Sequence, residues 1–201
     1  MAMIFMLCDH LWATLVPGND WLTDIGRLAF PIFAFMIAEG CKYTRNKLRY
    51  FLQLFGLALA CQIVYFIADG SMYLSVLFTF SLSVLTIFAL QYCKAKPKAL
   101  PVLLFVTVVA AVYILNEIFT IDYGFWGCML PVFAGACYMP KNAPEHLKKW
   151  HNKWVSLLCF TIGLCLLTYF DDYAEIQVYC LLALPLLALY AGKRGKRKMK
   201  Y

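Results

Sequence analysis

The chain is poor in charged residues. Only 14% of its 201 residues are Asp, Glu, Lys or Arg, whereas 63% are hydrophobic. Soluble domains carry about 25% charged and about 45–50% apolar residues. A soluble fold of this composition would have too little polar side chain to cover its surface. The sequence therefore excludes an ordinary soluble domain and indicates an integral membrane protein.

The sequence also lacks the spacings that hold metals, disulfides or phosphates. Its nine cysteines include no CxxC pair, and most fall within apolar runs, where Cys behaves as a small apolar residue. We therefore expect neither a disulfide framework nor a metal site. No Gly-rich phosphate loop, HExxH motif or nucleophile elbow occurs, so the usual motifs of soluble hydrolases and nucleotide-binding enzymes are missing.

What the sequence does contain is a series of eight apolar runs. A helix that crosses a bilayer needs about 17–25 mostly apolar residues, and the runs are close to that length. They cover residues 1–16, 25–41, 50–68, 73–93, 100–119, 124–139, 154–170 and 174–191. We predict an all-α polytopic transmembrane bundle that forms one domain over residues 1–191, followed by a basic tail over residues 192–201.

Single residues within the runs refine this prediction. The first run has no basic leader and contains two polar residues, so we expect a membrane helix there and not a signal peptide. Pro31, Pro131 and Pro185 lie inside runs and predict kinks. Gly56 with Ala60 has the spacing of a close contact between helices.

The connections between the runs alternate in charge. "PGNDWLTD", "DGSM", "TIDY" and "DDYAE" carry acids and no Lys or Arg, whereas "CKYTRNKLR", "KAKPK", the 140–153 loop and the tail are basic. Basic loops stay in the cytosol, so we predict a cell-membrane protein, of the bacterial inner-membrane type, with both termini in the cytosol. The net charge of +7 then reflects topology and contact with lipid headgroups, and it does not indicate a nucleic-acid partner.

Asp9 and His10 stand side by side inside the first run. A position about ten residues into a helix lies about 15 Å deep, near the middle of a core of about 30 Å. A charged group costs several kcal/mol there, so intramembrane ionisable residues are functional candidates. His10 is a candidate general base; the alternative is a structural histidine that bonds a neighbouring helix, with Asp9 as its partner.

Arg27 and Glu39 are the charged residues near the ends of the second run. Arg27 is either an arginine paired with Asp24 at the outer face or an anion anchor that points into an interior cavity. Glu39 precedes Lys42 by three residues, a spacing that favours an ion pair at the cytosolic interface.

Several stretches together resemble the TraX family of conjugal-transfer membrane proteins, which is associated with N-terminal acetylation of pilin. They are "MLCDHLW", "IGRLAFPIFAFMIAEGCKYTRNKLRY", "SVLFTFSLS", "DYGFWG" and "LYAGKRGK". The family is similar to a wider clan of multispan acyltransferases that take acyl-coenzyme A from the cytosol. The resemblance thus implies a membrane acetyltransferase that uses acetyl-coenzyme A as its co-substrate.

Carried onto this chain, the resemblance implies a catalytic role for His10 with Asp9 beside it, and it makes Arg27 a candidate cavity residue. The chain departs from the family in having Ser75 and Ala191 where Asn is usual. Family sequences also tend to continue past "GKRG" into a last helix, so we expect that helix to be absent here. Lys42, Arg45 and Arg49 are the cytosolic bases best placed to meet the phosphates of coenzyme A.

The leading hypothesis is therefore a membrane-embedded acetyltransferase. Its acceptor is an amine or a hydroxyl on a peptide, a glycan or a lipid. An alternative from another class is a small substrate-binding subunit of a membrane transporter, which would need a ligand cavity but no acyl donor. A structural or lipid-contacting protein with no small-molecule site is a further alternative. Besides membrane lipids and the acyl acceptor, a second copy of the chain in a homo-oligomer is a candidate partner. The adjacent Asp9 and His10 favour the enzyme.

Overall fold

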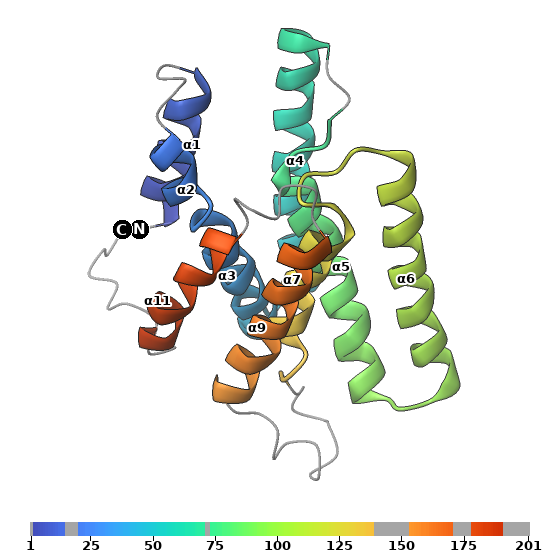
Figure 1. Ribbon diagram of the computed structural model, residues 1–201. Helices are drawn as coiled ribbons and strands as arrows, with labels where there is room; N and C mark the ends of the chain where they lie inside the picture. The colour runs from blue at the N-terminus through green and yellow to red at the C-terminus, as the bar shows by residue number, and fades with distance from the viewer. Residues whose placement is uncertain (1, 15–19, 71–72, 139–152, 171–177, 191–201) are drawn as a thin grey trace, which may run out of the picture.

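The structure is a computed structural model that describes residues 2–14, 20–70, 73–138, 153–170 and 178–190 (Figure 1). Within these ranges the chain is helical, apart from short connections and one isolated parallel bridge between Leu74 and Ile121. Most of the basic 140–153 loop, the acidic connection at 171–175, Ala191 and the tail at 192–201 lie outside the described residues.

The helices follow the predicted apolar runs. In chain order they are α1 (Ala2–Thr14), α2 (Asp20–Gly26), α3 (Ala29–Tyr43), α4 (Lys47–Asp69), α5 (Val76–Ala95), α6 (Ala99–Ile118), α7 (Gly124–Gly135), α9 (Lys153–Phe170), the 3-10 helix η1 (Val178–Leu182) and α11 (Ala183–Leu189). Among the described residues, α4, α5, α6 and α9 are long and apolar enough to cross a membrane. The all-α fold class is confirmed, while the number of spans, their insertion and the side of the termini stay predictions.

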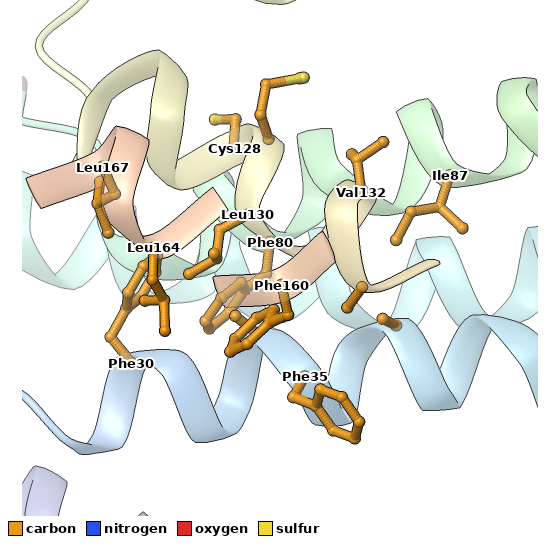
Figure 2. Packing of buried hydrophobic residues seen from close by; sticks show 14 of the residues in the cluster. Phe30, Phe35, Phe80, Ile87, Cys128, Leu130, Val132, Phe160, Leu164 and Leu167 are labelled. Carbon is orange, nitrogen blue, oxygen red and sulfur yellow. The ribbon is translucent and has the colours of Figure 1, made fainter. Parts of the chain in front are cut away.

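Side chains from α3, α5, α7 and α9 fill the core. Figure 2 shows Phe30 and Phe35 of α3 together with Phe80, Leu130 and Phe160 from the other three helices. The Phe30 and Phe80 rings stack with their centroids 5.5 Å apart, and Phe35 meets Phe160 edge to face at 5.6 Å. Since Leu130 and Phe160 have no exposed surface, the core lies where these four helices meet.

The remaining helices lie around this centre. In Figure 1, α6 runs along one edge of the bundle and α4 extends beyond its other helices. The α4 helix packs mainly against α5, and α6 packs against α5 and α7. On the opposite side, α1 packs against α2 and α3. The helix that carries His10 therefore lies beside α2 and α3, away from α4 and α6.

Two expectations about small residues and prolines need correction. Pro31 and Pro185 each occupy the third position of a helix, where a missing N–H costs no helical hydrogen bond, so they start helices and do not kink them. Only Pro131 lies in a helix interior. A Cβ built on Gly56 would have no neighbour within 4 Å, so the predicted close contact at Gly56 is wrong.

Among the described residues, connections of like charge meet at opposite ends of the bundle. At one end, Leu74 exchanges backbone hydrogen bonds with Thr120 and Asp122, at 2.9 Å each, which joins two acidic connections. At the other end, the Gln91 amide donates to the carbonyl of Cys41 at 3.3 Å. This arrangement matches the alternation of acidic and basic connections in the sequence. We call these the acidic end and the basic end.

Candidate functional site

His10 lies on the exposed side of α1. Its Nδ1 lies 2.8 Å from the carbonyl oxygen of Met6, one helical turn earlier. A carbonyl only accepts, so in this contact Nδ1 carries the hydrogen and Nε2 is the proton-accepting nitrogen of the neutral ring. Asp9 belongs to α1, but its side chain lies outside the described residues. The catalytic roles of both residues stay predictions.

Arg27 occupies the turn between α2 and α3, at the acidic end. Its guanidinium carbon lies 5.9 Å from the centre of the Tyr123 ring, and its backbone carbonyl accepts a hydrogen bond from the Cys180 thiol at 3.3 Å. Burial raises the pKa of Tyr123, and the Asp122 carboxylate acts in the same direction, while the Arg27 charge and its hydrogen bond to Tyr123 oppose them. Arg27 thus contacts the partly buried ring of Tyr123, on the connection between α6 and α7.

The backbone around Tyr123 explains the spacing of "DYGFWG". Tyr123 has a φ of 60°, the only positive φ outside glycine among the described residues, and Gly124 follows with a φ of 57°. A left-handed conformation costs a residue with a Cβ about 1–2 kcal/mol. A Cβ on Gly127 would lie 2.3 Å from the Tyr123 Cβ. The two glycines therefore allow Tyr123 to stack on Phe30 with centroids 3.7 Å apart.

Asp122 joins the connection between α6 and α7 to α5 and to Tyr73, which precedes α5. Its backbone carbonyl accepts a hydrogen bond from Thr79 at 2.7 Å, and its carboxylate accepts one from Tyr73 at 2.9 Å. Thr79 has no exposed surface. These bonds hold in place the connection that carries Tyr123, the residue that Arg27 contacts. Sequence reasoning missed Tyr123 as a partner of Arg27, although the aromatic residue lies in a stretch that resembles the family.

At the basic end, Glu39 of α3 is buried against Tyr138, which follows α7. The Tyr138 hydroxyl donates to Oε1 of Glu39, and the Lys42 ammonium lies 3.6 Å from the same oxygen. The predicted Glu39–Lys42 ion pair is therefore confirmed. Lys42 also lies over the rings of Tyr138 and Tyr43, at 4.6 and 5.0 Å.

Arg45 and Arg49 lie just beyond this pair. Both side chains are exposed, and Arg49 belongs to the first turn of α4, where its backbone N–H donates to the Asn46 side chain at 3.0 Å. Asn46 is thus the N-cap of α4. The two guanidinium groups are therefore carried at the surface of the basic end, within reach of a ligand that approaches there.

The four residues predicted to bind the donor do not share one site. Arg27 precedes α3 and Lys42 lies in its last turn, and the helix between them spans roughly 20 Å at about 1.5 Å per residue. Lys42 lies close in sequence to Arg45 and Arg49 at the basic end. Arg27 belongs to the acidic end, in the turn that follows α2. The structure thus places Arg27 and the group of Lys42, Arg45 and Arg49 at opposite ends of α3.

Two lysines of the basic connections cap helices and are engaged within the protein. Lys94 donates to the carbonyl of Ala136, the residue that caps α7. Lys153 donates to the carbonyl of Ala188 at 2.6 Å and to that of Tyr190, at the end of α11. A cation at a helix C-terminus satisfies its last carbonyls and complements the helix dipole. These lysines therefore join helices at the basic end.

A shallow apolar groove of about 480 Å³ lies between α6 and the start of α7. It is lined by Phe105, Val106, Val109, Ala110, Tyr113, Ile114 and Phe125. None of the predicted site residues lines it, and its lining is almost entirely apolar. We therefore assign it no part in the chemistry of His10.

Comparison with known proteins gives one match. No curated protein and no solved structure shows significant similarity to the chain. The family model described as TraX protein matches residues 1–201, the full length of the sequence. This match covers both ends of the bundle and includes every residue considered above. The chain belongs to the TraX family.

Proposed function

We propose that this chain is a membrane-embedded acetyltransferase that moves an acetyl group from cytosolic acetyl-coenzyme A to an amine or hydroxyl acceptor, with His10 as general base. Membership of a family linked to pilin acetylation in conjugation supports a transferase role. The all-helical bundle with long apolar helices supports a reaction at the membrane. The acceptor class follows from the chemistry of acyl transfer.

The observation that carries the proposal is the hydrogen bond between His10 and Met6. With Nδ1 turned to the Met6 carbonyl at 2.8 Å, the neutral ring presents Nε2 as the base. As the acceptor attacks the thioester carbonyl, Nε2 takes the proton from the attacking nitrogen or oxygen. The bond to coenzyme A then breaks and the thiolate leaves, and the proton held by His10 is available to it.

Direct transfer is the simpler of two routes through His10. In the other, Nε2 attacks the thioester carbonyl itself and an acetyl-histidine carries the group to the acceptor. Both routes need the same ring nitrogen, and both break the thioester bond to coenzyme A. The His10–Met6 contact supports each of them equally, because both use Nε2 while Nδ1 is turned to the Met6 carbonyl.

The basic end supplies a surface for the donor. Coenzyme A carries phosphates, and guanidinium groups bind phosphate oxygens through charge-assisted hydrogen bonds. Arg45 and Arg49 are exposed there, while Lys42 is engaged with Glu39. We assign the phosphate contacts to the two arginines. Arg27 stays the candidate anion anchor at the acidic end, where Tyr123 holds its guanidinium.

Acetyl transfer by the purified full chain from radiolabelled acetyl-coenzyme A tests the proposal. We expect His10→Ala to lower the rate about 10²–10⁴-fold, the usual contribution of a positioned base. The matched control is His146→Ala, since His146 lies in the loop predicted to be cytosolic and has no assigned role. An intact His10→Ala protein with the wild-type rate would contradict the proposal, as would a wild type without coenzyme A-dependent transfer.

A further inference from the structure

One carboxylate oxygen at the basic end has no hydrogen-bond partner among the described residues. Glu39 has only 8% of its surface exposed. Its Oε1 takes the Tyr138 hydroxyl and faces the Lys42 ammonium. Its Oε2 is buried and has no hydrogen-bond partner among the residues that the structure describes. Buried polar atoms are nearly always hydrogen-bonded, so an oxygen left over in this way indicates a missing donor.

The charge around Glu39 restricts what that donor can be. An ionised carboxylate only accepts hydrogen bonds, so the missing group must carry an N–H or O–H. Lys42 already lies 3.6 Å from the carboxylate, and the pair together is neutral. A second cation would add a positive charge to a pair that is already neutral and whose carboxylate is buried. A neutral N–H donor satisfies the oxygen without that cost.

The position of Glu39 indicates from where the donor comes. Glu39 lies in the last turns of α3, and the chain continues from there to Arg45 and Arg49. Polarity therefore changes over a short stretch of chain, from a buried neutral pair to exposed guanidinium groups. Coenzyme A has the same order of groups, with charged phosphates at one part and a neutral pantetheine arm, which carries amide N–H groups, leading to the thiol.

We propose that Oε2 of Glu39 accepts a hydrogen bond from an amide N–H of the pantetheine arm of the acyl donor, while Arg45 and Arg49 hold its phosphates. This inference rests on the proposed function, because it takes coenzyme A as the ligand. Glu39 is then a binding residue for the donor, and Tyr138 and Lys42 are positioning residues that hold its carboxylate in place.

Binding of coenzyme A and of pantetheine to the purified full chain tests this assignment without requiring catalysis. Glu39→Gln keeps the size of the side chain and an oxygen for Tyr138, but it replaces Oε2 with an amide nitrogen that cannot accept. We expect both ligands to bind about 10-fold more weakly or worse, as for loss of a hydrogen bond to a charged group. Glu117→Gln, an exposed glutamate of α6, is the matched control and should leave both affinities unchanged.

A second variant separates the two parts of the ligand. Arg45→Gln with Arg49→Gln should weaken coenzyme A and leave pantetheine binding within about 2-fold, because pantetheine lacks the phosphates. If Glu39→Gln binds pantetheine as the wild type does, the assignment to Glu39 is wrong and the proposed function stands. If the wild type binds neither ligand, the proposed function itself fails, and this inference falls with it.

Ligand analogues give a test that does not depend on how the Glu39 variant folds. Replacing an amide nitrogen of pantetheine with an ester oxygen removes one N–H and keeps the chain length. On the wild-type protein, one of the two possible esters should bind about 10-fold more weakly than pantetheine. Equal binding of pantetheine and both esters would overturn the proposal.

Discussion

The α4 and α5 helices look alike in hydropathy but have different places in the bundle. Both are long and apolar enough to cross a membrane, yet 44% of the α5 span is buried and only 6% of the α4 span. Hydropathy measures only compatibility with a bilayer. It does not tell whether a helix packs against protein or against lipid.

The feature that separates the two helices is a set of small hydroxyl side chains. Thr79, Ser81, Ser83 and Thr86 of α5 are all buried, whereas α4 contains no Ser or Thr. Small residues let neighbouring helices approach closely, and their hydroxyls bond to backbone carbonyls. The inner helix is therefore marked by its small polar residues. Three pairs of substitutions, each with one inner and one outer position, test this distinction.

The largest difference should appear at buried aromatic residues. Phe160 of α9 has no exposed surface, while Phe66 of α4 is 56% exposed. Phe160→Ala leaves a cavity beside Phe35, and we expect a loss of about 3 kcal/mol in the free energy of unfolding in mixed micelles. This value is at the low end for Phe→Ala, because lipid is as apolar as the core. Phe66→Ala should cost less than about 0.5 kcal/mol; equal losses would refute the distinction.

Glycines should give effects of opposite sign. A Cβ on Gly163 of α9 would lie 2.8 Å from the Phe133 ring and 3.1 Å from Leu130, whereas one on Gly56 of α4 meets nothing within 4 Å. We expect Gly163→Ala to destabilise by about 1–3 kcal/mol through overpacking. Gly56→Ala should stabilise by up to about 1 kcal/mol, because alanine favours the helix. Thermal unfolding of both variants measures the signs, and a stabilising Gly163→Ala would contradict this packing.

The positions of the helices were predictable because apolar runs of this length have few alternatives in a membrane protein. The residues at which the helices begin and end were less predictable. The second run was expected from residue 25, but α3 begins at Ala29 after a turn at Arg27 and Leu28. Pro31 favours a helix start at that point. The helix start was not predicted, because Pro31 lies inside a continuous apolar run.

Side-chain partners were predictable only where they are close in sequence. The Glu39–Lys42 pair follows from a spacing of three residues on one helix, and it is present. The bond from Tyr138 to Glu39 joins residues 99 positions apart. The contact of Arg27 with Tyr123 likewise joins residues far apart in the sequence that only the fold brings together. The arrangement of helices determines such contacts, and neither composition nor periodicity describes that arrangement.

The smallest effect should come from the hydroxyl groups that distinguish α5. Ser83 donates to the carbonyl of Cys128 on α7 at 2.7 Å and to that of Thr79 at 2.8 Å. Thr107 of α6 donates only to Leu103 in its own helix, at 2.9 Å, and is exposed. Both residues bond to a backbone carbonyl one turn earlier, so the contact between helices is the main difference.

Ser83→Ala should therefore lower the free energy of unfolding by about 0.6–1.7 kcal/mol, the range of interhelical hydrogen bonds in membranes. Thr107→Ala should change it by less than about 0.5 kcal/mol, because no second helix is involved. Titration with a denaturing detergent, followed by tryptophan fluorescence, measures both variants. The acceptor of the interhelical bond is the backbone carbonyl of Cys128, which no substitution of Cys128 removes. The control is therefore Ser83→Thr, which keeps the hydroxyl. If Ser83→Ala is as stable as the wild type, the small size of these side chains, and not their hydrogen bonds, accounts for the inner position of α5.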